Sequence, residues 1–318
     1  MTWEKPSYGM GWIPDYPDFR DYTEETQAVK DILRNTSVGS TGAGCGSAPL
    51  GKPKAGKREV AVPARGQAKP LPPSIDLRKW CSPVEDQRML GSCTAQAGAG
   101  VIEYYERKSF GRNIEASRLF LYKVTRNLMR MKGDTGAYLR TTIGAMVLFG
   151  VPPEEYWAYT DDADRFDAEP PAFCYAFAQN YKTIKYYRHD PPSETRREVL
   201  DRVKAYLAAG HPSMFGFTVY SSIDQAAEDG RIPYPSAKER IEGGHAVVAV
   251  GYDEEKMIEN KSGGGKTTGA LLIRNSWGRG WGEGGYGWLP YDYVLKGLAE
   301  DFWSVIKKEW VDTGAFCD

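Results

Sequence analysis

The chain has no long apolar run, although 41% of its 318 residues are hydrophobic. A membrane-spanning helix needs roughly 18 consecutive apolar residues, so no membrane partner is expected. An excess of one charge is also missing, because 41 Lys and Arg residues stand against 42 Asp and Glu residues. This balance gives no global field that would attract nucleic acid. The start of the chain, residues 1–6, has neither a basic cluster nor an apolar stretch, so no secretory signal is recognised.

Cysteine is scarce, and the number of cysteines is odd. The five are Cys45, Cys81, Cys93, Cys174 and Cys317. They are too few for a disulfide framework in a chain of this length, and at least one is expected to be free. Without a secretory signal, a reducing cytoplasmic compartment is favoured over secretion. The pairing of the four cysteines other than Cys93 is left open by the sequence.

The first 73 residues differ in composition from the rest. Their aromatic residues are Trp3, Tyr8, Trp12, Tyr16, Phe19 and Tyr22, followed by a helical pattern at 23–33. Aromatic residues at this density seldom remain in water. From 38 to 73, Gly, Ala, Pro, Lys and Ser dominate, which is typical of a flexible linker. We interpret 1–73 as an N-terminal segment tethered to a catalytic body.

The body from 74 onward changes from helical patterns to strand patterns. Ser92 is expected to cap a buried helix that runs to about Lys108 and closes at Gly111. Further helices are expected at 117–130, 139–149 and 195–209, and strands at 183–187, 214–220, 246–252, 271–274 and 286–289. This order predicts an α+β fold with a helical lobe at 74–180, a β-rich lobe at 181–318 and a cleft between them.

Four residues suit nucleophilic catalysis by a thiol. Cys93 stands at the predicted helix start, where the helix dipole favours a thiolate. Of only three histidines, His189 and His211 occupy polar or turn contexts expected to be solvated or structural, whereas His245 opens an apolar strand after two glycines. Asn275 follows another apolar strand and precedes a run of Trp and Gly. Gln87, six residues before Cys93, offers an amide donor for an oxyanion.

These motifs together resemble the papain-like cysteine peptidases, and the bacterial xylellain-like branch most. The resemblance rests on Gln87 to Cys93, on Gly243-Gly244-His245-Ala246-Val247, and on Asn275-Ser276-Trp277-Gly278 ahead of Gly280-Trp281-Gly282. It extends from about Pro73 to Ile306. Two positions depart from plant and animal members: Leu90 replaces a cysteine of a usual disulfide, and Thr94 replaces a tryptophan. Neither departure touches the catalytic atoms.

The resemblance implies a two-lobed papain-like fold and roles for particular residues. Cys93 and His245 would face one another across the cleft, with Asn275 orienting His245, Gln87 completing the oxyanion site, and Trp277 and Trp281 covering the His245–Asn275 bond. Substrate would bind along Gly136, Ala137, Tyr138 and Leu139, near Gly244 and Trp277. Glu300, or Asp301 after a one-residue slip, would form the floor of the pocket for P2, the second substrate residue before the cleaved bond. The alternative is that Glu300 and Asp301 both face solvent.

The predicted function is that of a cysteine endopeptidase that hydrolyses peptide bonds through a thioester. The resemblance also implies a zymogen, in which residues before Pro73 restrain activity. Peptides or proteins are the expected partners of a monomeric chain, with no cofactor and no metal. Two alternatives remain: an exopeptidase or transferase that uses the same residues, and a catalytically silent binding module on the same fold.

Overall fold

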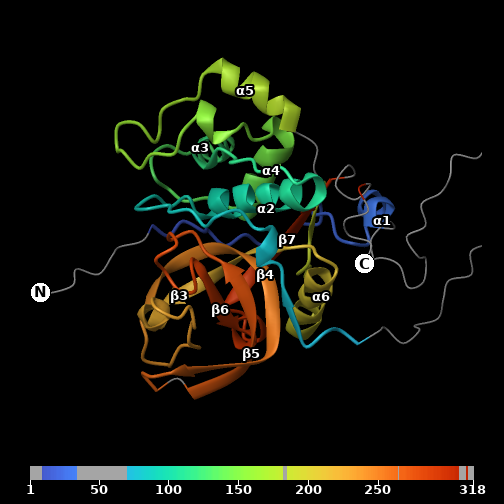
Figure 1. Ribbon diagram of the computed structural model, residues 1–318, viewed down its shortest axis with the longest axis vertical. Coiled ribbons are helices and arrows are strands. Elements are labelled where there is room, and N and C mark those ends of the chain that lie inside the picture. Colours follow the sequence, from blue (N-terminus) through green and yellow to red (C-terminus); the bar gives the residue numbers. More distant parts are fainter. Residues whose placement is uncertain (1–8, 34–69, 182–184, 264, 308–312, 314–318) are drawn as a thin grey trace, which may run out of the picture.

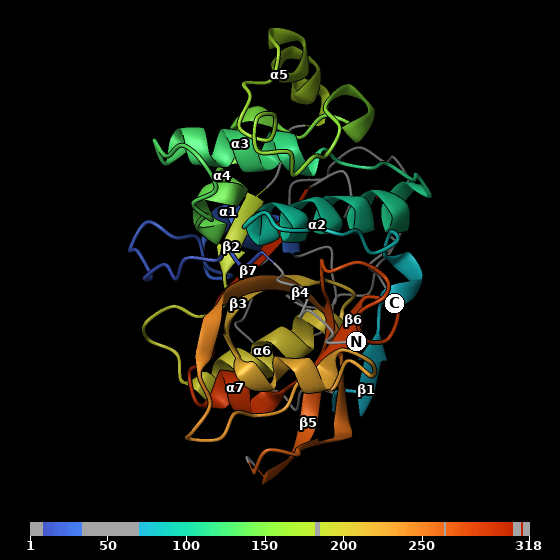
Figure 2. The same ribbon diagram turned by 90° about the vertical axis from the view of Figure 1, so that its left-hand side faces the viewer.

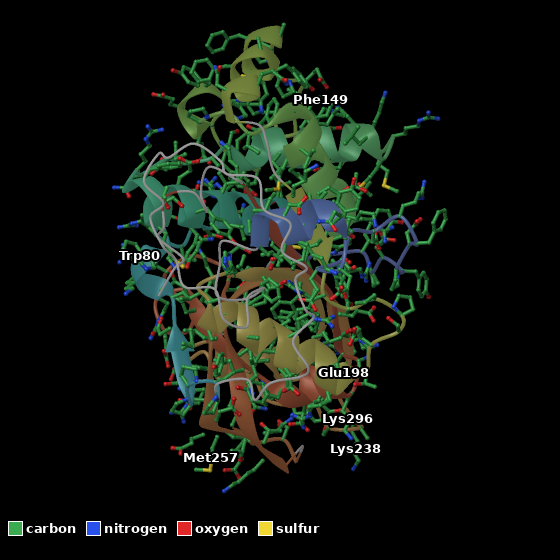
Figure 3. All side chains as sticks on the ribbon, turned by 90° about the vertical axis from the view of Figure 1, so that its right-hand side faces the viewer. Trp80, Phe149, Glu198, Lys238, Met257 and Lys296 are labelled. Atoms are coloured by element: carbon green, nitrogen blue, oxygen red, sulfur yellow. The ribbon has the colours of Figure 1, made fainter. Side chains whose placement is uncertain are left out.

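Helices from the first half of the chain and strands from the second half form two separate lobes (Figure 1). The computed structural model describes residues 9–33, 70–181, 185–263, 265–307 and 313. In Figure 1 the N-terminal segment, drawn in blue, runs between the lobes. Figure 3 shows Phe149 on the helical lobe and Met257 at the opposite end of the molecule.

The helical lobe is built around α2, which is buried along most of its length. Its helices are α2 (Cys93–Phe110), α3 (Arg118–Leu128), α4 (Leu139–Phe149) and α5 (Ala172–Ala178), with short 3-10 turns η1 (Arg78–Trp80), η2 (Glu154–Tyr156) and η3 (Gln179–Tyr181). Alanine and glycine at the start of α2 let α3 and α4 approach closely: a methyl group at Gly98 would press on Leu121 and Met146. This packing fixes the helix end that carries Cys93.

Helix ends follow the predicted signals with one exception. Gly111 ends α2 in the left-handed conformation, at φ 65°. Ser92 occupies the N-cap position of α2, but its side chain makes no capping bond. Its hydroxyl instead pairs with the Tyr159 hydroxyl at 2.8 Å. The first turn of α2 therefore keeps N–H groups that no side chain of its cap satisfies.

The helix α5 was not expected from the sequence.

The β-rich lobe holds a seven-stranded sheet whose pairs are all antiparallel. Its strands are β1 (Ser74–Asp76), β2 (Lys185–Arg188), β3 (Ser213–Tyr220), β4 (Ile241–Asn260), β5 (Gly265–Arg274), β6 (Tyr286–Pro290) and β7 (Ala299–Ile306). The order is β2-β7-β3-β4-β5-β6, with β1 paired to β4. The sequence did not indicate β1 or β7. Because Ser74–Asp76 joins the sheet, the helical lobe begins later than the predicted boundary at 74.

Two helices complete the β-rich lobe, α6 (Arg196–Ala208) and α7 (Tyr291–Leu295), with the 3-10 turn η4 (Ser221–Ala226). The cap of α6 is a capping box between Thr195 and Glu198. The long β4 and β5 strands form a hairpin. β4 brings His245, and β5 brings Asn275 at its end, to the sheet edge that faces α2.

The N-terminal segment is extended from Gly9 and ends in α1 (Gln27–Leu33). Val29 and Leu33 of α1 share a buried cluster with Tyr187, Tyr206 and Ile306 of the β-rich lobe. The segment is thus docked on the body at both of its described ends. Residues 34–69, which carry most of the predicted linker, lie outside the described residues, so that linker stays a prediction.

Cys81, Cys93 and Cys174 are free and buried, while Cys45 and Cys317 lie outside the described residues. The open question of pairing is therefore answered for Cys81 and Cys174, which form no disulfide. Within the described ranges, none of the helices is both long and apolar enough to cross a bilayer.

His189 and His211 are both wholly buried, which corrects the expectation of a solvated loop at His189. His189 Nε2 lies 2.8 Å from the Ser304 hydroxyl, and His211 Nδ1 lies 3.0 Å from the Tyr105 hydroxyl. Burial lowers the pKa of each imidazole to about 3. Both remain neutral at physiological pH and act as packing residues.

The helical lobe's core predicts a clear difference between two truncations. Phe120→Ala removes a fully buried ring that contacts Tyr175 edge to face, and it should lower the free energy of unfolding by about 3–5 kcal/mol. Leu148→Ala, at a side chain that is 50% exposed, should change it by less than about 0.5 kcal/mol. Urea unfolding followed by circular dichroism measures both, and equal midpoints would contradict this packing.

Candidate active site

Cys93 is the first residue of α2, and its side chain is completely buried. Burial raises the pKa of the thiol to about 11, although backbone groups of Ala246, Gly11 and Thr94 act in the opposite direction. Two of these groups come from different parts of the chain, since Ala246 belongs to β4 and Gly11 to the N-terminal segment. In this state Cys93 is a neutral thiol, enclosed by both lobes and by the segment.

His245 lies in β4 with its ring fixed by Asn275. His245 Nε2 and Asn275 Oδ1 are 2.8 Å apart, and the Ser276 N–H donates to the same oxygen at 2.8 Å. Because that oxygen can only accept, Nε2 carries the proton in the neutral ring. Within the described part of the chain, Nδ1 is buried without a hydrogen-bond partner. The imidazole is therefore held in one tautomer, with the lone pair of Nδ1 free.

Trp277 covers the His245–Asn275 bond as predicted. Its ring stacks on the imidazole with centroids 4.5 Å apart and planes at 24°, and Trp281 packs on Trp277 edge to face. Burial lowers the pKa of His245 to about 4, while the bond to Asn275 acts in the opposite direction. In the closed cleft, Cys93 and His245 are therefore both uncharged.

Gln87 reaches the active site from the loop before α2. Its side-chain oxygen accepts from the Ser276 hydroxyl at 2.5 Å. Its Nε2 donates to the carbonyl oxygens of Gly9 at 2.7 Å and Leu90 at 2.8 Å. The amide predicted to serve an oxyanion is fully buried, and a carbonyl of the N-terminal segment accepts one of its hydrogen bonds.

The segment from Gly9 to Ile13 fills the cleft and bonds to both of its walls. The N–H groups of Gly9, Trp12 and Ile13 donate to the carbonyl oxygens of Arg88 (3.0 Å), Gly244 (3.1 Å) and Ala137 (3.1 Å), and the Ala137 N–H donates to Gly11 (2.7 Å). Figure 2 shows the same segment passing between the lobes at the level of α2. The backbone of the segment therefore uses the groups that a substrate backbone is expected to use.

Glycines on both sides make this close fit possible. A methyl group at Gly11 would overlap the backbone of Gly91, and one at Gly136 would overlap the carbonyl of Gly11. Gly136 also has φ 73°, which side chains disfavour. On the opposite wall, a methyl group at Gly244 would overlap Trp12. The cleft and the segment are complementary only while these positions carry no side chain.

Trp12 occupies a pocket beside the catalytic residues. Its indole lies on Gly216, where any side chain would overlap the ring. The indole N–H donates to Asp301 Oδ2 at 3.2 Å, and Trp303 donates to the other oxygen of that carboxylate at 2.6 Å. Asp301 is fully buried, and burial raises its pKa to about 7, opposed chiefly by Arg188. The pocket therefore ends in an acid that binds an N–H donor.

The predicted substrate-binding residues divide into three groups. Gly136, Ala137 and Gly244 contact the segment directly, and Trp277 covers His245. Leu139 is buried and Tyr138 half-buried at the start of α4. Glu300 is a correction, because its half-exposed side chain pairs with Arg196 at 3.6 Å. Asp301, which the sequence offered after a one-residue slip, is the acid that binds the Trp12 indole.

Several residues of this site were not predicted from the sequence. Gly9, Gly11 and Gly216 were not singled out, and Trp12 was noted only as one aromatic among six. The sequence Gly9-Met10-Gly11-Trp12 could have indicated this contact. Two glycines separated by one residue permit a close approach of another backbone, and a large aromatic ring follows them.

Comparisons with known proteins agree with this geometry. The model of the papain family cysteine proteases matches residues 71–302. The crystal structure of xylellain, a cysteine protease from Xylella fastidiosa, is 31% identical with a TM-score of 0.68, covering 96% of this chain and 99% of that one. Procathepsin L 3 of Tenebrio molitor, at 20% identity and TM-score 0.54 over 75% of this chain and 70% of that chain, shares the fold.

Curated relatives give the same result. An uncharacterized peptidase C1-like protein of Acanthamoeba polyphaga mimivirus is 37% identical over 226 residues, which are 69% of this chain and 68% of that protein. Mouse cathepsin K is 27% identical over 224 residues, which are 69% of this chain and 60% of that protein. The chain belongs to the papain family, and it is a cysteine peptidase with the two-lobed α+β fold of that family.

The closed cleft predicts a slow reaction of Cys93 with iodoacetamide at pH 7.5, since the thiol is buried and protonated. Gly11→Val should accelerate the labelling of Cys93 at least about tenfold, because a side chain there overlaps the Gly91 backbone and displaces the segment. Phe19→Ala is the matched control on the same segment, at a side chain that is 96% exposed. Mass spectrometry of the labelled peptide separates Cys93 from the other cysteines. Equal rates in the three proteins would contradict occlusion.

Proposed function

We propose that this cysteine peptidase acts through Cys93, His245, Asn275 and Gln87, and that its N-terminal segment restrains it. Three contacts carry the proposal: the ordered His245–Asn275 pair, the Gln87 donor, and the segment that lies across both. The thiolate of Cys93 attacks the substrate carbonyl carbon, and His245 passes the thiol proton to the leaving amine. Water then hydrolyses the thioester, with His245 as the base.

The direction of the segment explains why it is not itself a substrate. In a substrate, the P2 residue precedes the cleaved carbonyl along the chain. Here Trp12 occupies the P2 pocket, while Gly9 and Gly11, which precede it, lie at Gln87 and Cys93. The segment therefore runs opposite to a substrate, and no carbonyl of it is presented for attack with the leaving amine on the correct side.

The extent of the segment favours a removable restraint over an exopeptidase cap. An exopeptidase needs one end of the cleft blocked and the catalytic centre open. The described segment instead covers the catalytic centre itself, since Gly9 engages Gln87 and Trp12 bonds to Gly244 beside His245. Hydrolysis of a peptide requires this part of the chain to leave. An endopeptidase released from a zymogen is therefore the function that we propose.

The catalytic roles predict a graded series of activities. Cys93→Ala should abolish hydrolysis of a peptide substrate, and Asn275→Ala should lower kcat about tenfold or more without abolishing it, because Trp277 still packs on His245. Deleting the residues before Pro73 should raise turnover of a small substrate. Full activity in Cys93→Ala would refute the nucleophile, and unchanged turnover in a folded truncation would refute the restraint.

The pocket of Trp12 predicts the P2 preference. Its glycine-lined wall suits a large flat side chain, and Asp301 suits an N–H donor, so Trp and Arg should be accepted at P2 beside Leu or Phe. Since the pKa of Asp301 is raised to about 7, its charge is lost as the pH falls below 7. The ratio of kcat/KM for P2-Arg over P2-Trp peptides should therefore rise between pH 5.5 and pH 8.

Two isosteric variants test this floor residue. Asp301→Asn should lower kcat/KM for the P2-Arg peptide about tenfold relative to a P2-Leu peptide, because the charge-assisted bond is lost. Glu300→Gln is the matched control and should leave the ratio unchanged, since Glu300 pairs with Arg196 outside the pocket. An effect of Glu300→Gln with none of Asp301→Asn would reverse the assignment.

A further inference from the structure

The segment is held beyond the P2 pocket by two arginines of the body. Arg140, in the first turn of α4, pairs with Asp15 at 3.0 Å and with Asp21 at 2.8 Å, and donates to the carbonyl oxygen of Tyr16 at 2.7 Å. Arg188, at the end of β2, lies 3.7 Å from Asp21 and donates to the carbonyl oxygen of Asp15 at 3.1 Å. The contacts therefore combine charge with backbone recognition.

The two arginines differ in the carboxylate partners that remain to them when the segment leaves. Arg188 pairs with Asp190 at 2.9 Å and with Asp301 at 3.3 Å, and both acids belong to the body. The hydrogen bonds and ion pairs that the structure gives Arg140 within the described residues are all to the N-terminal segment. Departure of the segment thus leaves Arg140 as a guanidinium without a carboxylate.

Arg140 stands at a defined place in the cleft. It follows directly on Gly136–Leu139, and its guanidinium lies 5.8 Å from the ring centroid of Trp303, which itself bonds to the pocket floor Asp301. Along the segment, Trp12 stands between Gly11, which contacts Cys93, and Asp15, which pairs with Arg140, so the guanidinium lies beyond Trp12 from Cys93. A substrate places there the residues that precede P2, and the segment places there Asp15, three residues beyond Trp12.

We propose that Arg140 forms a carboxylate-binding subsite of the released enzyme and selects substrates with Asp or Glu two to three residues before P2, at P4 or P5. The aspartates of the segment occupy this subsite in the closed state. The guanidinium lies 5.8 Å from the ring centroid of Trp303, a residue of the body that stays when the segment leaves. This contact with an aromatic ring favours a charge-assisted, bidentate bond over a fully solvated ion pair.

The subsite rests on the proposed endopeptidase function but can be tested apart from it. The test uses the full chain carrying Gly11→Val, Asp15→Asn and Asp21→Asn, called the opened variant, in which the segment neither fills the cleft nor competes for Arg140. Peptides with P2 Trp carry either Glu or Gln at P4, and a second pair carries them at P5. Their Kd values are measured by fluorescence anisotropy on the opened variant with Cys93→Ala, where no hydrolysis is needed.

The Glu peptide of one pair should bind about 5- to 10-fold more tightly than its Gln counterpart, and this ratio should fall in high salt. Arg140→Gln should bring the ratio to about 1 while leaving the Kd of the Gln peptide unchanged. Arg196→Gln is the control, since Arg196 is a surface arginine paired with Glu300. Equal Kd values for Glu and Gln at both positions, or a preference that survives Arg140→Gln, would overturn the subsite.

The same peptides separate this proposal from the catalytic one. On the opened variant with Cys93 intact, kcat/KM should show the Glu preference together with hydrolysis of every peptide. Tight, Arg140-dependent binding without hydrolysis would support the subsite and refute the catalytic assignment. Hydrolysis of the Glu and Gln peptides at equal rates and with equal Kd would support the catalytic assignment and refute the subsite.

Discussion

Hydrogen bonds between two loops hold the lobes in the register on which the active site depends. The Gln87 N–H donates to Ser276 at 2.8 Å, the Ser276 hydroxyl donates to the Gln87 side chain, and the Gly278 N–H donates to Glu85 at 3.0 Å. One loop leads into the helix of Cys93, and the other continues from Asn275. Gln87 and the loop after Asn275 also hold the groups proposed for catalysis. The contacts that join the two lobes therefore also align those groups.

The N-terminal segment binds to both aligned lobes and covers the residues between them. It bonds to Gln87 on one lobe and to Gly244 on the other, so its bound position depends on how the two lobes are placed. Once seated, it excludes water from Cys93 and His245, and desolvation disfavours the charged form of each. The proposed restraint therefore has two parts: the segment blocks access to Cys93, and the thiolate–imidazolium pair does not form while it is bound.

Much of this arrangement was predictable from the sequence because it is local. The start of α2 at Cys93, the bounds of α4, and the apolar parts of the strands that deliver His245 and Asn275 follow from local residue patterns, although Ser92 makes no capping bond. The acid that binds the Trp12 indole was not predictable to the residue. Successive side chains of a strand point to opposite faces, so a one-residue slip exchanges Glu300 at the surface for Asp301 in the pocket.

Long-range pairing accounts for the other differences. His189 stands in a polar, Pro-rich stretch that read as solvated, but Asp190 accepts the backbone N–H groups of Asp301 and Phe302 and draws the stretch into the core. The binding position of Trp12 could not be predicted from the sequence either. The residues that surround its ring, Gly216, Gly244 and Asp301, are distant from it in the chain.

Amide hydrogen exchange at Ala137 tests the central claim most directly. In the intact protein this N–H is bonded to Gly11 of the segment, so it should exchange about as slowly as the amides of the core strand β5. In Gly11→Val its exchange should accelerate at least about tenfold while the β5 amides stay protected. Exchange of Ala137 in the intact protein at the rate of an exposed loop amide would show that the segment does not occupy the cleft.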